Sequence, residues 1–304
     1  MKKLALVIAC IVGCVTPSRL DADVLAGLTP RPGKRTTTFA LIIGVNRSVN
    51  KKHPTLEFAD DDALRFYGYF KEIGDKTYLL TRPDADSLKL HQGSKVTWAP
   101  TLEKLREKVT AIKRDIENRL DKQSPVELFI VFTGHGDVDS KGRGYLALED
   151  AQLTAEDLRK EILDPLNART FHRVHLIIDA CKAHSTFNRR GPKKSSTTAI
   201  TGGHAAFRFV YADMPNVGLL SATSAVDAAT LESRELQAGV LSHSLLSGLA
   251  GAADTSGDGN VTYRELASFA QRSFNAIPNR HFRPTMFLRD PWSRKNNSTL
   301  VRIQ

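Results

Sequence analysis

Cysteine is scarce in this sequence, with three among 304 residues. Two of them, Cys10 and Cys14, lie in an N-terminal segment that has the pattern of an export signal. The exported body would then hold one thiol, Cys181, and no internal disulfide, which excludes a disulfide-stabilised scaffold. A single thiol in an oxidising compartment needs a chemical reason, so Cys181 is a candidate nucleophile. The alternative is a small buried residue at the end of a strand.

Signals of nucleic-acid binding are also missing. The chain is basic, with a formal charge of +10 and a pI of about 9.6, but it contains no nucleic-acid-binding module and no row of aromatics among its basic residues. We therefore expect no nucleic-acid partner and attribute the charge to solubility and general attraction of anions. The sequence has no internal repeat, and its 41% hydrophobic content is ordinary for a globular protein.

The first 14 residues match a signal peptide. A basic head at 1–3 is followed by an apolar run at 4–12 that is too short to span a bilayer. The run ends in IVGC at 11–14, which resembles a bacterial lipobox, and no A-x-A-like site follows nearby. We predict an exported protein that is either periplasmic or tethered to the membrane through a lipidated Cys14. A linker over 15–38 follows, rich in Pro, Gly, Thr and basic residues towards its end.

Two apolar stretches end in reactive side chains. The first reads VELFIVFTGHG at 126–136 and delivers His135; the second reads VHLIIDAC at 174–181 and delivers Cys181. Continuous apolar runs are typical of parallel strands that helices cover on both faces. Chemistry in such sheets lies at the carboxyl ends of the strands, so we expect both side chains at one rim. This arrangement favours a cysteine hydrolase.

Strand and helix patterns alternate between residues 39 and 292. This alternation predicts one α/β domain with a mainly parallel sheet of about six strands and helices on both faces. A tail at 293–304 follows. Strand patterns lie at 39–44, 77–80, 126–135, 145–148, 174–181, 217–222 and 284–288, and helix patterns at 56–73, 99–120, 154–163 and 240–252.

Several motifs of this domain occur in the order and spacing of the caspase and metacaspase superfamily of cysteine peptidases, which the chain resembles. His135 precedes Cys181 by 46 residues (181 − 135), against about 50 in caspases. The resemblance implies a caspase-like three-layer sandwich. The motifs are FALIIGVN at 39–46, LEFADDDA at 56–63, TGHG at 133–136, YLALED at 145–150, LTAEDL at 153–158 and DAC at 179–181.

The resemblance also implies residue roles. Cys181 would be the nucleophile and His135 the acid/base, and the N–H groups of Gly136 and Cys181 would form the oxyanion hole. Caspases have glutamine two residues before the cysteine and cut after aspartate, whereas this chain has Asp179. In metacaspases the matching aspartates, here Asp62 and Asp179, line the primary pocket together with a serine that is Thr133 here. We therefore expect protein or peptide substrates cut after Arg or Lys.

A second motif, DTSGDGNVTYRE at 254–265, fits the calcium loop of an EF-hand. Gly259 would make the sharp turn, and helix patterns flank the loop. Calcium is therefore the expected cofactor, with no organic cofactor; the alternative is an Asp/Gly turn between two helices. The expected ligands are Asp254, Ser256, Asp258, the carbonyl of Asn260, Thr262 through water, and Glu265.

Four alternatives bear on these assignments. A zinc site made of His172, His175, Cys181 and His184 is excluded, because an extended run from 175 to 181 spans about 20 Å and its ends cannot share one ion. The basic loop at 182–206 is either a self-processing site or an ordinary solvated loop. The acids at 57 and 60–62 either cap a helix or serve function. After the cysteine the chain reads KAHS, where metacaspases usually read HSG, so a catalytically inactive binding or signalling module stays open.

Overall fold

The computed structural model describes residues 36–91, 98–119, 121–141, 143–180, 214–223, 232–277, 285–292 and 297–303. Several predictions fall outside these residues. They concern the signal segment with Cys14, the linker up to residue 35, Cys181, and the basic loop at 182–206.

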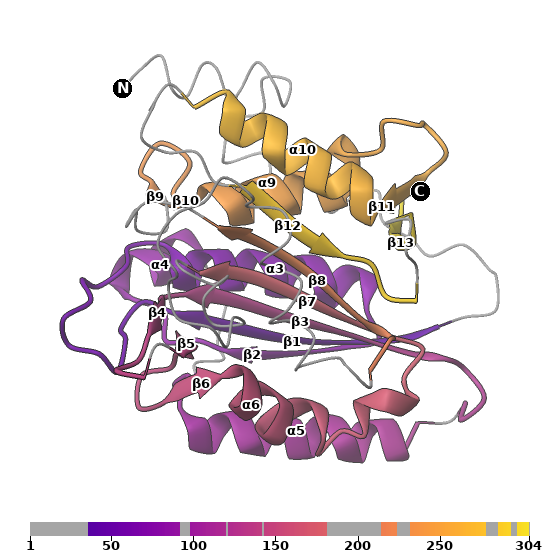
Figure 1. Ribbon diagram of the computed structural model, residues 1–304, viewed down its shortest axis with the longest axis horizontal. Helices are drawn as coiled ribbons and strands as arrows, with labels where there is room; N and C mark the ends of the chain where they lie inside the picture. The colour runs from indigo at the N-terminus through magenta and orange to yellow at the C-terminus, as the bar shows by residue number, and fades with distance from the viewer. Residues whose placement is uncertain are drawn as a thin grey trace.

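A six-stranded sheet forms the centre of the molecule, in the order β12-β8-β7-β3-β1-β2 (Figure 1). Neighbouring strands run parallel except at one edge, where β12 pairs antiparallel with β8. The predicted mainly parallel sheet is therefore confirmed. Its strands are β1 (Thr37–Val45), β2 (Lys76–Leu80), β3 (Val126–Gly134), β7 (Arg173–Ala180), β8 (Val217–Thr223) and β12 (Thr285–Arg289).

Helices cover both faces of this sheet and make the predicted three-layer α/β sandwich. In Figure 1, α3, α9 and α10 lie above the sheet, and α5 and α6 lie below it. The helices are α3 (Ala59–Ile73), α4 (Ala85–Leu90), α5 (Leu102–Glu117), α6 (Ala155–Leu158), α9 (Val240–Ser247) and α10 (Tyr263–Asn275); short π or 3-10 turns are η1 (Arg159–Leu163), η2 (Ala168–Thr170) and η3 (Gly248–Ala252).

Three small antiparallel sheets stand beside the central one. Their strands are β4 (Gly136–Val138), β5 (Gly144–Ala147) and β6 (Gln152–Thr154); β9 (Glu232–Ser233) and β10 (Ala238–Gly239); and β11 (Asn260–Thr262) and β13 (Thr299–Arg302). The last pair matters for the chain end, because β13 lies within the predicted tail and joins it to the 254–265 loop.

The pleat of the strands explains why β1 reads as an unbroken apolar run. Ala40 and Ile42 belong to the core under α3, α9 and α10. Leu41 and Ile43 belong to the core over α5 and α6. Because successive side chains of a strand point to opposite faces, a sheet with two covered faces needs an apolar residue at every position.

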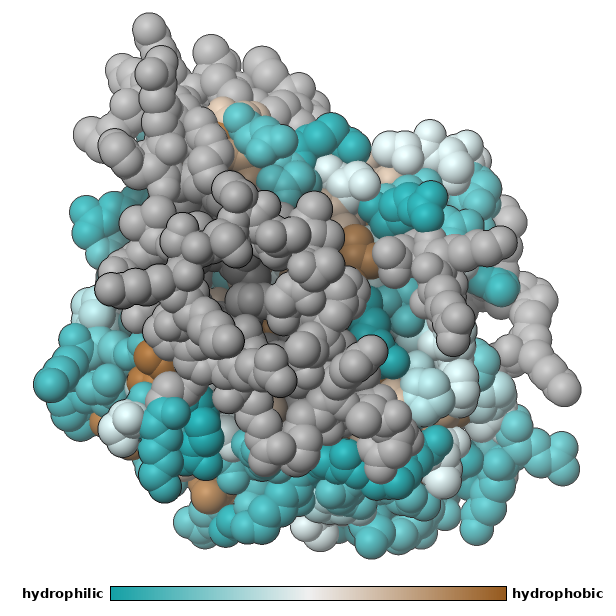
Figure 2. All heavy atoms as spheres, viewed as in Figure 1, coloured by the Kyte–Doolittle hydropathy of each residue, from teal (hydrophilic) through white to brown (hydrophobic). Residues whose placement is uncertain are grey.

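One face of the molecule is mainly polar where the structure describes it. On the face shown in Figure 2, hydrophilic residues cover most of the described surface, with small and separate apolar areas. Within the described residues, no helix has both the length and the apolar character needed to cross a membrane.

Helix α3 approaches β1 closely at Gly44. A Cβ built at this position would lie 2.4 Å from the Cβ of Ala63 and 2.6 Å from the carbonyl oxygen of Ala59. Only glycine allows this approach, which fixes the first turn of α3 against the carboxyl end of β1.

We predict that Gly44→Ala lowers the free energy of unfolding by about 1–3 kcal/mol, because the added methyl group pushes α3 from the sheet. Gly68→Ala, within α3, is the control. A Cβ at Gly68 meets nothing within 4 Å, so alanine should stabilise the helix by about 0.5–1 kcal/mol. Thermal unfolding followed by circular dichroism measures both, and equal melting temperatures would contradict the packing described.

Candidate active site

The parallel register of β3 and β7 brings the two predicted catalytic positions to adjacent strand ends. Thr133 pairs with Asp179, and Gly134 pairs with Ala180. His135 directly follows β3, and Cys181 directly follows β7 in the sequence; Cys181 itself lies outside the described residues. Gly136, the predicted oxyanion residue, directly follows His135 and begins β4.

His135 is nearly buried and makes one hydrogen bond that determines its tautomer. Its Nε2 lies 2.7 Å from the carbonyl oxygen of Pro54. A carbonyl only accepts, so Nε2 carries the proton and donates, and Nδ1 remains for acid/base chemistry. Burial lowers the pKa of His135, and the bond to Pro54 opposes this effect. The ring is therefore held through Nε2, and Nδ1 is the nitrogen that could exchange a proton.

Two buried carboxylates, those of Asp62 and Asp179, converge on Gly239. A Cβ at this glycine would lie 2.8 Å from Oδ2 of Asp62 and 3.0 Å from Oδ2 of Asp179. The backbone N–H of Gly239 donates to Asp62 over 2.8 Å. Ser242 donates to Asp179 through its backbone N–H over 3.0 Å and its hydroxyl over 2.6 Å. The two predicted pocket aspartates are thus brought together.

Arg65 offsets the charge of this carboxylate pair only in part. Burial raises the pKa of Asp62 well above its ordinary value; the charge of Arg65 opposes that rise, and the charge of Asp179 adds to it. Burial raises the pKa of Asp179 as well. Oδ1 of Asp62 is buried without a hydrogen-bond partner. The nearest cation, Nη1 of Arg65, lies 3.6 Å from that oxygen and donates to the carbonyl of Gln237 over 2.7 Å. A cationic ligand would relieve the mutual repulsion.

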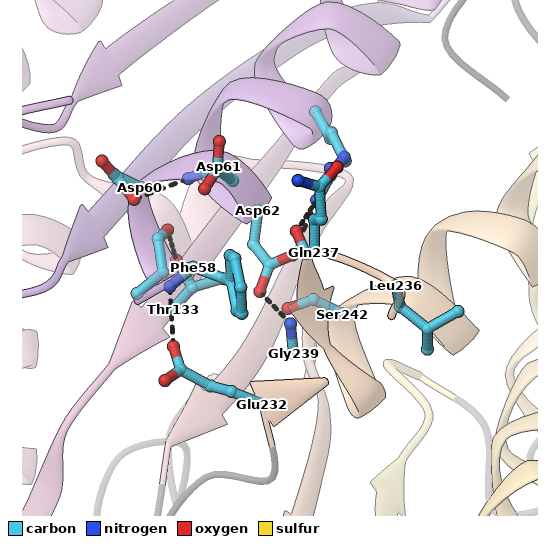
Figure 3. Close-up of polar contacts among 12 residues, drawn as sticks. Phe58, Asp60, Asp61, Asp62, Thr133, Glu232, Leu236, Gln237, Gly239 and Ser242 are labelled. Carbon is cyan, nitrogen blue, oxygen red and sulfur yellow. Dashed lines mark hydrogen bonds and ion pairs between the residues drawn. The ribbon is translucent and has the colours of Figure 1, made fainter. Parts of the chain in front are cut away.

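A third carboxylate, Glu232, was not predicted from the sequence. It accepts hydrogen bonds from the backbone N–H group of Phe58 over 2.8 Å (Figure 3) and from that of Glu57 over 3.0 Å. Burial raises the pKa of Glu232, and the charges of Glu57 and Asp179 contribute to the rise. Glu232 lies in a two-residue strand without hydrophobic periodicity, so the sequence offers no local signal for it.

The other acids at the start of α3 are structural. Asp60 accepts hydrogen bonds from Asn46 over 2.7 Å and from the hydroxyl of Ser87 over 2.8 Å. Asp61 lies 2.9 Å from Nε2 of His91. Within the acidic cluster 60–62, Asp60 and Asp61 therefore have structural partners, and Asp62 is the member that faces Asp179.

Thr133 lies beside the carboxylate pair, but its hydroxyl is already engaged. Oγ1 donates to the carbonyl oxygen of Ala59 over 2.7 Å, and the residue is buried. Its single proton therefore ties β3 to the first turn of α3, which carries Asp62.

The 254–265 loop has the backbone that its motif requires. Gly259 has a φ of 76°, a conformation that favours glycine. Asp254 accepts hydrogen bonds from the N–H groups of Gly257 and Gly259 over 2.8 and 3.0 Å. Glu265 folds back and accepts from the N–H and hydroxyl of Thr262 over 3.0 and 2.8 Å. In the described part of the chain, no three or more His, Cys, Asp or Glu side chains lie close enough together to hold a metal ion.

The loop is nevertheless joined to the central sheet. Tyr263, which begins α10 directly after the loop strand β11, forms a 2.7 Å hydrogen bond between its hydroxyl and Nδ1 of His175. His175 lies in the middle of β7, stacked on Phe129 with ring centroids 4.2 Å apart. Burial holds the pKa of His175 well below its ordinary value, so the ring is neutral.

We predict that Asp62→Asn raises the melting temperature at pH 8, because it removes a buried charge that faces Asp179. A raised carboxyl pKa means that the native state binds more protons than the unfolded state, so this penalty grows as pH rises above the ordinary carboxyl range and vanishes below it. The expected gain is about 2–4 °C, shrinking towards pH 4. Differential scanning calorimetry across pH measures it.

Asp139→Asn is the control for that experiment. Hydrogen bonds from Arg143 lower the pKa of Asp139, so its loss should give no gain at pH 8. A melting temperature of Asp62→Asn that falls at pH 8 would show that Arg65 offsets the carboxylate pair fully and would contradict this account.

Comparisons with known proteins add a distant structural likeness. No protein-family model matches the sequence, and no curated protein matches it. Among solved structures, the crystal structure of caspase-1 from Spodoptera frugiperda is similar, with a TM-score of 0.47 and 13% sequence identity over 87% of this chain and 96% of that one. A likeness at this level carries no conclusion about activity, and the three-layer α/β architecture rests on the strand order and the helices described above.

Proposed function

We propose that this protein is a cysteine endopeptidase of the caspase and metacaspase type that cleaves after Arg or Lys. The observation that carries the proposal is the pair of buried carboxylates, Asp62 and Asp179, beside the strand ends that lead to His135 and Cys181. The motifs that resemble this superfamily lie at the same positions and support the proposal independently of the geometry.

In the proposed reaction, the sulfur of Cys181 attacks the carbonyl carbon of the scissile peptide bond. A carbon–sulfur bond forms, the thiol proton passes to Nδ1 of His135, and the carbonyl oxygen becomes an oxyanion. The N–H groups of Gly136 and Cys181 would stabilise that charge. His135 then returns the proton to the leaving amine as the carbon–nitrogen bond breaks, and water hydrolyses the acyl-enzyme with His135 as base.

Specificity follows from the charge of the pocket. An Arg or Lys side chain would place its cation against Asp62 and Asp179, whose carboxylates repel each other and are offset only in part by Arg65. Glu232 would add a third negative group at the edge of the pocket. An acidic substrate side chain would meet like charges, which costs several kcal/mol in a buried site.

We predict that the protein hydrolyses reporter peptides ending in Arg or Lys and not those ending in Asp. Asp179→Asn should reduce kcat/KM for an Arg peptide by about 30- to 1,000-fold, the loss expected when one partner of a buried charge pair is removed. Asp86→Asn, an exposed acid on α4, is the control and should change little. The measurement is initial rates across peptide concentration.

Cys181→Ala should abolish turnover in the same assay. Turnover that persists in this variant, or that ignores the residue before the cleaved bond, would contradict the proposal. A lack of turnover on every peptide, with or without calcium, would favour the alternative of a catalytically inactive module.

We also propose that the 254–265 loop binds calcium. Its hard oxygen donors and the turn at Gly259 suit this ion, and Glu265 would exchange its bonds to Thr262 for the metal. The proposed ligands are Asp254, Ser256, Asp258, Asn260, Thr262 and Glu265.

Isothermal titration calorimetry with calcium chloride should show one site per chain, with an affinity down to the millimolar range known for exported modules. Asp254→Asn should weaken binding at least tenfold, whereas Asp139→Asn should leave it unchanged. Equal heats for the wild type and Asp254→Asn would contradict this assignment.

A further inference from the structure

A second histidine, His53, lies against the candidate acid/base. The ring centroids of His53 and His135 are 4.7 Å apart, with an angle of 32° between the ring planes. His53 directly precedes Pro54, whose carbonyl oxygen holds Nε2 of His135. His53 therefore contacts the ring of His135 and also determines where the acceptor for that ring lies.

The His53 ring is itself fixed from two sides. Its Nε2 donates to Oδ2 of Asp137 over 2.9 Å, and its Nδ1 lies 2.9 Å from the hydroxyl of Ser48. The side-chain nitrogen of Asn50 lies 3.3 Å from the same Nε2. The His53 and Asp137 side chains are both mostly buried, at 13% and 22% exposed, so this bond is shielded from water.

Asp137 belongs to the segment on the other side of His135. It lies in β4, two residues after His135, whereas His53 lies in the loop between β1 and α3. The contact between His53 and Asp137 therefore joins the loop that supplies the Pro54 acceptor to the segment that carries His135. The loop has other anchors, such as the bond from the N–H of Val49 to the carbonyl of Leu148 over 2.8 Å, so the bridge adjusts the position of Pro54 rather than folding the loop.

We propose that His53, held by Asp137, is a positioning residue for His135 and keeps its ring in the orientation that the proposed acid/base role requires. This inference rests on the proposed peptidase function. Errors of about 1 Å in the placement of a catalytic group can cost about 100-fold in rate, which is the scale on which such a support acts.

The two members of the bridge also act on the charge of His135 in opposite directions. Burial is the largest influence and lowers the pKa of His135; the Pro54 bond raises it, His53 lowers it and Asp137 raises it. These are the titratable and charged groups facing His135 from the loop and from β4 among the described residues. Removing His53 should therefore raise the pKa of His135, and removing the charge of Asp137 should lower it.

The first test reads His135 directly and does not require activity. In the Cys181→Ala background, labelled with ¹³C-histidine, NMR titration follows the His135 ring, assigned through His135→Gln. We expect His53→Gln to raise the pKa of His135 and Asp137→Asn to lower it. His172→Gln, which removes a half-exposed histidine at the opposite end of β7, should leave it unchanged. Shifts in the same direction, or none in either variant, would overturn the proposal.

The second test is kinetic and uses the full-length enzyme. His53→Ala should lower kcat about 10- to 100-fold with KM nearly unchanged, and His53→Gln, which can still donate to Asp137, should recover most of that loss. The His53→Ala/Asp137→Asn pair should be no slower than the slower single variant, because both act through one bridge. A loss confined to KM, or additive losses, would overturn the positioning role, whereas an inactive wild type with the opposed NMR shifts would place the failure in the peptidase proposal.

Discussion

The site depends on the register in which β3 pairs with β7. Thr133 lies opposite Asp179 and Gly134 opposite Ala180, so His135 leaves the sheet beside the end of β7. The pleat adds a second constraint, because Ile177 and Asp179 face the layer of α3 and α9 while Ala180 faces the opposite core. A shift of one residue would turn Asp179 away from Asp62 and into the apolar core over α5. Covering both faces of the sheet with apolar side chains makes that shift costly.

The same register concentrates negative charge in a buried place. Asp62 comes from α3, Asp179 from β7, and the backbone that holds them comes from Gly239 and Ser242 near the start of α9. Gly44 and Thr133 fix the first turn of α3. A structure that only needed stability would place apolar residues here, and we propose that the carboxylate pair serves to bind a cationic side chain and costs stability when none is bound.

The strands that have a local hydrophobic pattern could be predicted from the sequence. β1, β3 and β7 are unbroken apolar runs because both of their faces are buried, and His135 was recognisable as the residue that ends one of them. Asp62 and Asp179 were predicted through the superfamily resemblance, since nothing in the acidic stretch 60–62 distinguishes Asp62 from its neighbours. Only the folded chain shows that Asn46, Ser87 and His91 engage Asp60 and Asp61.

Contacts between distant segments could not be predicted. Glu232 meets the start of α3 across more than 170 residues, and β13 pairs with the 254–265 loop from the predicted tail. His53 reads in the sequence as an ordinary residue of a polar loop, and its proximity to His135 arises only when that loop folds over β4.

The central claim is that Cys181 is a nucleophile served by an acidic pocket. Its most direct test is covalent labelling with a peptidyl-arginine acyloxymethyl ketone and with the matching aspartyl reagent, read by intact-mass and peptide mass spectrometry. The account predicts one adduct with the arginyl reagent, located on Cys181 and lost in His135→Ala, and none with the aspartyl reagent. Equal labelling by both reagents, or no adduct on Cys181, would contradict it.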